Sequence, residues 1–332
     1  MTSYWDCNFF TFFVVLGRRI LSLFQGDFQQ IASDEVQLLV LSAVAISSGI
    51  ISPFLVLKRL AMLANSLSHT ILLGIAISAL SAKWLWGGQW FDVPTLLLGA
   101  LLAAALTAFC TETLIRWFRL PEDASIGLVF TGLFALGITF VNIYLRSAHL
   151  GVEAIMGNVD ALQLRDIRLP ALFIGINALA VILFFKQLQV ISFDQQLAKT
   201  LGFNVGFFRY LFLFLISATC IGAFRSVGVI LVLSFLTGPY LTARLFSNRL
   251  NHLLVWTPAL GLFASLIGVA LSRHLFNVHG WALSTGGIVS MVIGILYLIA
   301  KGLAYLRRAK LNSSHRPSNM VSSESVIPGK DL

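Results

Sequence analysis

Residues 36–57, VQLLVLSAVAISSGIISPFLVL, form an apolar run without a charged side chain, and the basic pair Lys58-Arg59 follows it directly. A helix needs about 20 predominantly apolar residues to cross the hydrocarbon core of a bilayer. Backbone groups in that core must be hydrogen-bonded within the protein, as they are in a helix. The run therefore predicts a transmembrane helix that ends at a charged membrane surface.

The same pattern recurs downstream, where apolar runs of membrane length end at short loops that are basic or rich in Gly and Pro. Of the 332 residues, 58% are hydrophobic and 11% are charged, and the mean hydropathy is +0.87. This composition excludes an ordinary soluble domain. We predict an all-α polytopic membrane protein with one membrane domain, residues 36–306. About nine spans are expected: Val36–Leu57, Leu67–Ala82, Val93–Ile115, Ala124–Leu145, Pro170–Phe185, Phe207–Ala223, Val227–Leu245, Leu253–Leu271 and Leu283–Leu306.

The two ends of the chain differ from this domain. Residues 1–35 are predicted to form an N-terminal segment, in which the apolar stretch from Phe9 to Phe24 is short and contains Arg18-Arg19. No small-residue cleavage site follows, so an interfacial helix or a partial span is favoured over a cleaved signal peptide. Residues 307–332 are mostly Ser/Asn/Pro-rich and predict a disordered cytoplasmic tail.

The basic residues indicate orientation rather than a nucleic-acid partner. The net charge is +9, but many Lys and Arg residues sit in pairs at the ends of spans, as the positive-inside rule requires. With the C-terminus in the cytoplasm, fifteen of the 23 Lys and Arg residues lie on the inner side, so we expect an N-out, C-in chain. The three cysteines lack a CxxC spacing, which argues against a disulfide framework or thiolate metal site.

Small residues at four-residue spacing predict close helix packing. Helices gain little hydrophobic energy from association inside lipid, so small side chains that let backbones approach supply much of it. Three pairs show this spacing: Gly74 with Ser78, Gly99 with Ala103, and Gly261 with Ser265.

The segment 56–78, VLKRLAMLANSLSHTILLGIAIS, places polar groups inside an apolar span. Asn65 and His69 are four residues apart and share one helix face. A neutral imidazole and an amide oxygen can ligate a divalent metal transiently. The alternative is a helix-start amide and a histidine bonded to a neighbouring span, and the residues alone do not separate the two.

The segment 190–210, VISFDQQLAKTLGFNVGFFRY, lies on the predicted inner side, with residues 192–206 as a cytoplasmic loop. Asp194 can cap a short helix that runs through Leu201, and Gly202 then ends it. Phe193, Leu197 and Leu201 recur every four residues and give the helix one apolar face. Such a helix suits docking into a groove of a soluble protein; the alternative is a helix that lies on the bilayer.

Two further features fall in or near spans. Thr237, Gly238 and Pro239 lie in the middle of one span, where proline removes a backbone donor. A kink that only shapes packing and a role in transport are both open there. Glu112, near the inner end of another span, is expected to pair with Arg116 four residues on.

The predicted outer side also carries titratable residues. His149 and Glu153 are four apart, with Asp160 further along, and they would present an imidazole and a carboxylate at the outer mouth if helical. His274 and His279 lie in another expected outer loop. For each of these residues a solvated loop position is the favoured alternative.

Taken together, five stretches resemble the permease subunits of bacterial ABC importers for manganese, zinc or iron. They occur in the order of that family, and the last resembles most the branch found in spirochaetes and chlamydiae. The stretches are LKRLAMLANSLSHTILLGIA (57–76), EDASIGLVFTGLFALG (122–137), VISFDQQLAKTLG (190–202), SVGVILVLSFLTGPYLTARLF (226–246) and GWALSTGG (280–287).

The resemblance implies a type II importer core in the bacterial inner membrane, with a second permease subunit that is an identical copy or a paralogue. It implies a cytoplasmic ABC ATPase docked at the loop of Asp194, and an extracytoplasmic metal-binding protein that delivers the ion. The divalent metal is cargo, and no permanently bound cofactor is expected. Family members commonly carry Asp where this chain has Asn65, which weakens the metal role of Asn65 while His69 keeps its match.

The sequence carries no phosphate loop of the form GxxxxGK[ST], no HExxH helix and no GxSxG elbow. We therefore expect a permease subunit that is not itself an enzyme, with ATP hydrolysed by the partner. An ion-gradient-driven secondary metal transporter is the first alternative, and a multi-pass lipid-modifying membrane enzyme is a weaker one. Which metal is carried does not follow from the sequence, because manganese, iron and zinc share these ligands.

Overall fold

A computed structural model describes residues 8–24, 32–58, 93–144 and 159–314, together with positions 62, 65, 66, 69, 70, 73, 74, 76–78, 80 and 81. These residues form helices and turns, with no strand among them. The α-helices are α1 (Phe9–Phe24), α2 (Ser33–Leu57), α4 (Val93–Trp117), α5 (Glu122–Tyr144), α7 (Arg168–Phe193), α8 (Gln195–Thr200), α9 (Val205–Val227), α10 (Val229–Arg244), α11 (Leu250–His279) and α12 (Thr285–Ser314). Two 3₁₀ turns, Val159–Ala161 and Leu164–Ile167, precede α7.

The prediction of a polytopic helical membrane protein is confirmed. Within the described residues, six helices are long and apolar enough to cross a bilayer: Ser33–Leu57, Asp123–Ile143, Leu164–Phe193, Val205–Phe224, Leu250–His279 and Thr285–Arg307. The count of nine is not confirmed, because α10 has only 16 residues and the expected span at 67–82 lies partly outside the described residues. The 25 residues of α4 match the expected third span.

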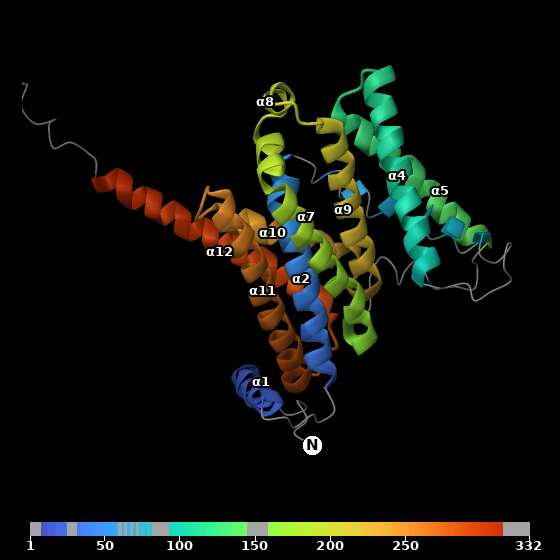
Figure 1. Cartoon of the computed structure of the whole chain (residues 1–332). Coiled ribbons are helices and arrows are strands. Elements are labelled where there is room, and N and C mark those ends of the chain that lie inside the picture. The colour runs from blue at the N-terminus through green and yellow to red at the C-terminus, as the bar shows by residue number, and fades with distance from the viewer. Residues whose placement is uncertain are drawn as a thin grey trace, which may run out of the picture.

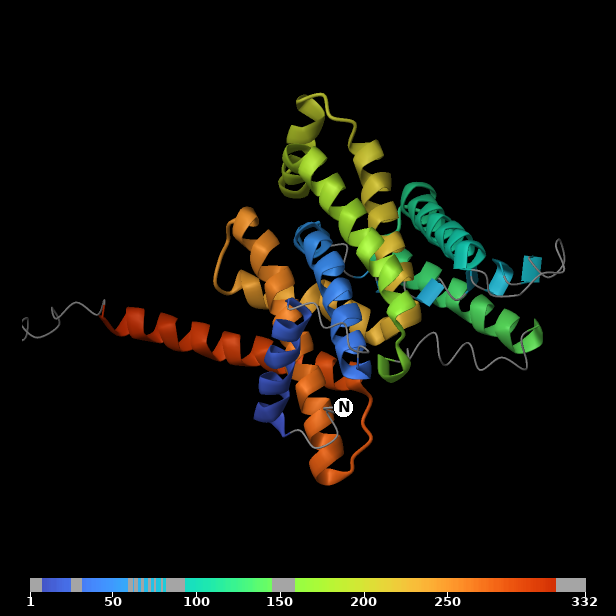
Figure 2. The same cartoon turned by 60° about the horizontal axis from the view of Figure 1, so that its bottom comes forward.

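Helix α2 lies at the centre of the bundle, with α7, α10 and α11 packed around it (Figure 1). Its sequence explains this position, because after Gln37 the helix contains only apolar, small and hydroxyl side chains, with no charged or amide group. Helices α4 and α5 form a pair beside α9 (Figures 1 and 2). We call the end of the bundle that carries α8 the inner end, following the orientation expected from the charges.

Close approach of small residues brings two of the predicted pairs together. A Cβ atom added to Gly99 of α4 would lie 2.5 Å from the carbonyl oxygen of Gly74 and would also overlap Ser78. The reverse holds at Gly74, where an added Cβ would lie 2.6 Å from that of Ala103. The helical positions between 62 and 81 therefore pack directly on α4, as small-xxx-small spacing allows in a membrane.

In the third predicted pair, Gly261 with Ser265 of α11, the glycine packs closely on the central helix, α2. A Cβ at Gly261 of α11 would lie 3.1 Å from that of Ala45 in α2, and one at Gly49 would lie 2.9 Å from Pro258. Contacts under 3.4 Å leave little room for a larger side chain. The backbones of α2 and α11 thus approach each other closely between Ala45 and Gly49 of one helix and Pro258 and Gly261 of the other.

A buried amide joins three helices. The side chain of Asn177 in α7 is fully buried, and its Nδ2 donates to the Ser47 carbonyl (3.1 Å) and hydroxyl (3.1 Å) of α2 and to the Thr219 hydroxyl of α9 (2.8 Å). Hydrogen bonds between membrane helices are worth about 0.6–2 kcal/mol each. They also fix the rotation of α7, because turning this helix would break the bonds from Nδ2 to α2 and α9.

One glycine forms the turn from α9 into α10. Gly228 has φ +81°, a left-handed conformation that side chains other than glycine rarely adopt, and it is the only residue between the two helices. Helix α10 then continues through Pro239. The hydroxyl of Ser52 in α2 donates to the Leu236 carbonyl (2.6 Å), close to the carbonyl that proline leaves without a donor.

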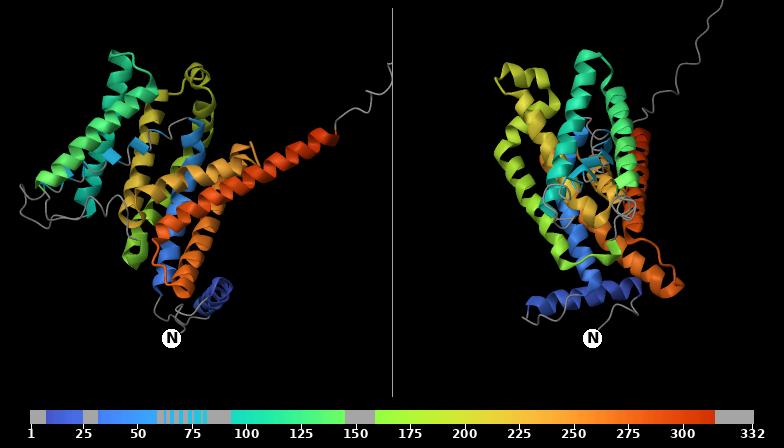
Figure 3. Two further views of the ribbon diagram at one scale, coloured as in Figure 1. Left: turned by 180° about the vertical axis from the view of Figure 1, so that it is seen from behind. Right: turned by 90° about the vertical axis from the view of Figure 1, so that its right-hand side faces the viewer.

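The helices at the two ends of the chain contribute to the core, through Phe12 of α1 and Val289 of α12, and also extend beyond it. Helix α1 lies crosswise at the outer end (Figures 1 and 3), and Arg19 pairs with Glu35 of α2 at 2.5 Å. Helix α12 leaves the bundle at an angle and runs to Ser314, beyond the boundary at 306 that the sequence predicted (Figures 1 and 2). Arg, Ala, Lys and Leu in 307–311 favour this extension. Residues 315–332 of the expected tail lie outside the described residues.

The contact between Gly99 and Gly74 yields the first prediction. Replacing Gly99 by leucine should destabilise the helix pair by about 1–3 kcal/mol, because the added side chain overlaps backbone and Ser78. Gly132→Leu on α5 is the matched control, since no described atom lies within 4 Å of its added Cβ. Reversible unfolding in mixed detergent micelles measures both, and equal stability of the two variants would contradict the packing described.

Candidate functional site

His69 lies against helix α5. The centroid of its imidazole is 5.2 Å from the ring of Phe130 and 5.2 Å from the ring of Phe134. These two phenylalanines are one turn apart and stack on each other at 5.8 Å. We call Phe130 and Phe134 the aromatic wall. The sequence predicted a role for His69 but not this contact, because the two phenylalanines are 61 or more positions away in the chain.

Two polar atoms beside this wall lack hydrogen bonds. The Nδ1 atom of His69 and the hydroxyl of Ser66 are buried and have no partner among the described residues. The neighbouring Thr70, by contrast, accepts a hydrogen bond from the Thr107 hydroxyl of α4 (2.8 Å). Buried polar atoms are normally paired, so the imidazole nitrogen is free to act as a ligand to a bound ion or to a partner group.

Asn65 lies one helical turn before His69 and is half-buried. Within the described ranges, however, no group of three or more His, Cys, Asp or Glu side chains could hold a metal ion. His149 and Glu153, expected at the outer mouth, lie outside the described residues. The histidine therefore offers one ligand rather than a complete centre.

Helix α8 projects at the inner end (Figure 1) and forms as the sequence predicted. The Asp194 carboxylate accepts hydrogen bonds from the backbone N–H groups of Gln196 (2.8 Å) and Leu197 (3.1 Å), and Gly202 follows the helix with φ +80°. Both ends of this six-residue helix are thus capped.

The apolar residues of this segment face outward rather than into the bundle. Phe193, Leu197 and Leu201 are 63%, 50% and 57% exposed, whereas Ala198 is fully buried against the chain. A capped helix with exposed apolar side chains at the inner end is a ready contact surface for another molecule.

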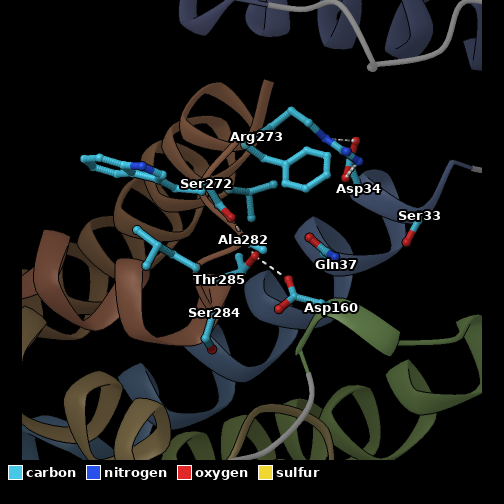
Figure 4. Close-up of a pocket in the computed structure, with 13 residues that line it drawn as sticks. Ser33, Asp34, Gln37, Asp160, Ser272, Arg273, Ala282, Ser284 and Thr285 are labelled. Atoms are coloured by element: carbon cyan, nitrogen blue, oxygen red, sulfur yellow. Dashed lines mark hydrogen bonds and ion pairs between the residues drawn. The ribbon is translucent and has the colours of Figure 1, made fainter. Parts of the chain in front are cut away.

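The outer end carries a polar cavity of about 500 Å³ (Figure 4). Arg273 of α11 donates from Nε to Asp34 of α2 (3.0 Å) and makes a second bond from its terminal nitrogen. The hydroxyl of Thr285 donates to Asp160 (2.5 Å). Gln37 is buried, and its amide points into the cavity between these groups. Such a lining accommodates polar or hydrated groups rather than lipid chains.

One prediction for this end was wrong, and one contact was not predicted. His274 and His279 do not lie in a loop, because α11 continues to His279, where Gly280 (φ +67°) ends it. The ion pair of Asp34 with Arg273 was not anticipated. An arginine within an apolar helix signals a buried partner, but its identity, 239 residues away, follows only from the fold.

Comparison with known proteins gives a consistent result. The model of the ABC 3 transport family matches residues 35–303. A relative from Chlamydia muridarum (strain MoPn / Nigg), described as "Probable metal transport system membrane protein", is 35% identical over 311 residues, 93% of this chain and 96% of the relative. The "Manganese transport system membrane protein MntD" of Bacillus subtilis (strain 168) is 32% identical over 77% of this chain and 87% of its own length.

A solved structure supports the same assignment. The structure described as "PsaBC from Streptococcus pneumoniae in complex with Fab" matches with a TM-score of 0.69 and 25% identity, over 84% of this chain and 95% of the matched chain. The matches extend through the helices that position His69, α8 and the outer cavity. The chain therefore belongs to the ABC 3 transport family, as a multi-pass permease.

Proposed function

We propose that this chain is the permease subunit of an ATP-driven importer that carries a divalent metal ion inward across the bacterial inner membrane. The observation that carries the proposal is the buried Nδ1 of His69, which has no hydrogen-bond partner in the part of the chain that the structure describes. The relatives of this chain include proteins named for metal and manganese transport. The family is one of ABC transporters, which favours ATP over an ion gradient as the energy source.

His69 acts as a transient ligand in this proposal. Phe130 and Phe134 contact the imidazole of His69, and its Nδ1 binds the ion. This nitrogen and the Asn65 amide together bind the ion weakly enough to release it. Conduction requires such weak, sequential binding. The second permease subunit, identical or paralogous, supplies further ligands, including the carboxylate that Asn65 does not provide. Manganese, iron and zinc are all compatible with these groups.

Helix α8 couples this pathway to the cytoplasmic ATPase. Its exposed Leu197 and Leu201 enter a groove of the ATPase, and Asp194 and Gly202 keep the helix rigid enough to transmit movement. This chain itself does not hydrolyse ATP. The extracytoplasmic metal-binding protein releases its ion at the opposite end, near the cavity lined by Asp160 and Gln37.

The role of His69 is tested by His69→Ala. We expect metal uptake to fall about tenfold or more, the loss that corresponds to removal of an interaction of about 1.4 kcal/mol. Radiolabelled manganese uptake, with iron and zinc as competitors, measures it in cells of equal expression. His252→Ala is the control, because His252 is an exposed residue of α11 at the inner end. Wild-type uptake in His69→Ala would remove this residue from the pathway.

The docking role of α8 is tested by Leu197→Glu. The charge should prevent burial in the ATPase, so ATP hydrolysis stimulated by the metal-binding protein should drop to the basal rate. The fold should survive, since Leu197 is half exposed. Gln196→Glu places the same charge on the neighbouring exposed position and should retain stimulation. Normal stimulated hydrolysis in reconstituted Leu197→Glu complexes would refute the docking proposal without bearing on His69.

A further inference from the structure

Basic side chains from four parts of the chain meet at the inner end around a cavity of about 330 Å³. These basic residues come from three helices and from the residue that follows α2. The cationic lining residues are Lys58 after α2, Arg116 of α4, Lys199 of α8 and Arg209 of α9, and the described part of the lining contains one carboxylate, Glu112.

The single carboxylate does not balance these charges. Glu112 accepts from Nε of Arg116 (2.5 Å) and pairs with the terminal nitrogen of Arg209 (2.9 Å), so both of its oxygens are engaged. Lys58 has an aromatic neighbour instead, with its ammonium 4.7 Å from the ring centroid of Phe212. Burial and the nearby Arg209 guanidinium lower the pKa of Lys58 to about 8. The cavity therefore holds surplus positive charge that an anion would stabilise.

An apolar groove continues from this cavity toward the membrane interior. It has a volume of about 370 Å³, lies between the same two helices, α4 and α9, and shares Tyr210 with the cavity. Leu102, Phe109 and Phe214 line it and are 62%, 69% and 49% exposed. The two helices lie side by side with their inner ends together (Figures 1 and 3). A groove of this kind accepts an acyl chain.

We infer that an anionic phospholipid of the inner leaflet binds between α4 and α9, with its phosphodiester headgroup in the basic cavity and an acyl chain in the groove. Basic pockets between membrane helices on the cytoplasmic side favour anionic headgroups. The joined groove favours a lipid over a soluble phosphate, which would leave it empty. Because Lys199 of α8 lines the cavity, the bound headgroup would brace α8. The inference holds whichever ion is carried.

Native mass spectrometry of the detergent-purified full chain tests this inference. Phosphatidylglycerol should be retained about tenfold more than phosphatidylcholine of the same acyl chains. Glycerol phosphate, which offers the anion without chains, should not compete at equal concentration. Arg209→Gln should reduce phosphatidylglycerol retention several-fold while Glu112 keeps its bond to Arg116. Arg249→Gln, an exposed arginine outside the cavity, should leave retention unchanged.

The groove is tested separately. Ala105 is an exposed residue that lines the groove, so the bulky side chain of Ala105→Trp should fill the groove and weaken retention of the lipid. Ala135→Trp on α5, exposed and outside the groove, is its control.

Three results would each overturn the inference. They are equal retention of the two lipids, full competition by glycerol phosphate, and unchanged retention in Ala105→Trp. A fourth result would overturn it as well: loss of the lipid when the complex is assembled, which would mean that a partner subunit occupies the groove.

Discussion

The bundle depends on contacts that only small or hydrogen-bonding side chains can make. Lipid chains solvate apolar surfaces as well as leucine does, so burial alone does not hold transmembrane helices together. Asn177 meets this constraint at the centre, where one amide joins α7 to α2 and α9. The glycine contacts of α2 with α11, and of the positions around Gly74 with α4, meet it elsewhere. Each contact fixes distance and rotation together.

The packing of the helices also determines which polar groups are hydrogen-bonded and which have no partner. The hydroxyls of Thr70 and Thr107 are hydrogen-bonded to each other between helices. Nδ1 of His69, which lies against the rings of Phe130 and Phe134, has no partner among the described residues. The helix that carries His69 is held to α4 by Gly74 and Ser78 on the same segment. The packing motif further along the same segment therefore also fixes the position of His69 relative to α4.

What the sequence predicted well is local. Apolar runs marked the spans, the spacing of small residues marked close contacts, Asp194 marked the start of α8, and Glu112 with Arg116 marked an ion pair one turn apart. What it missed depends on distant parts of the chain. The pairs Asp34 with Arg273 and Asp160 with Thr285 are 239 and 125 residues apart. Periodicity carries no information on which faces of two distant helices meet. The edge of α11 was misplaced for another reason, since its polar last turns resemble a loop in composition.

Gly228 has a mechanical consequence. Loops between helices ordinarily absorb motion, but here a single buried residue in the left-handed region separates α9 from α10. If α9 tilts at its end near α8, the start of α10 must move with it. The hydrogen bond from the Ser52 hydroxyl to α10 would then move the central helix, α2, as well. The two helices would then move together rather than independently. A longer connection at this point would uncouple their movements.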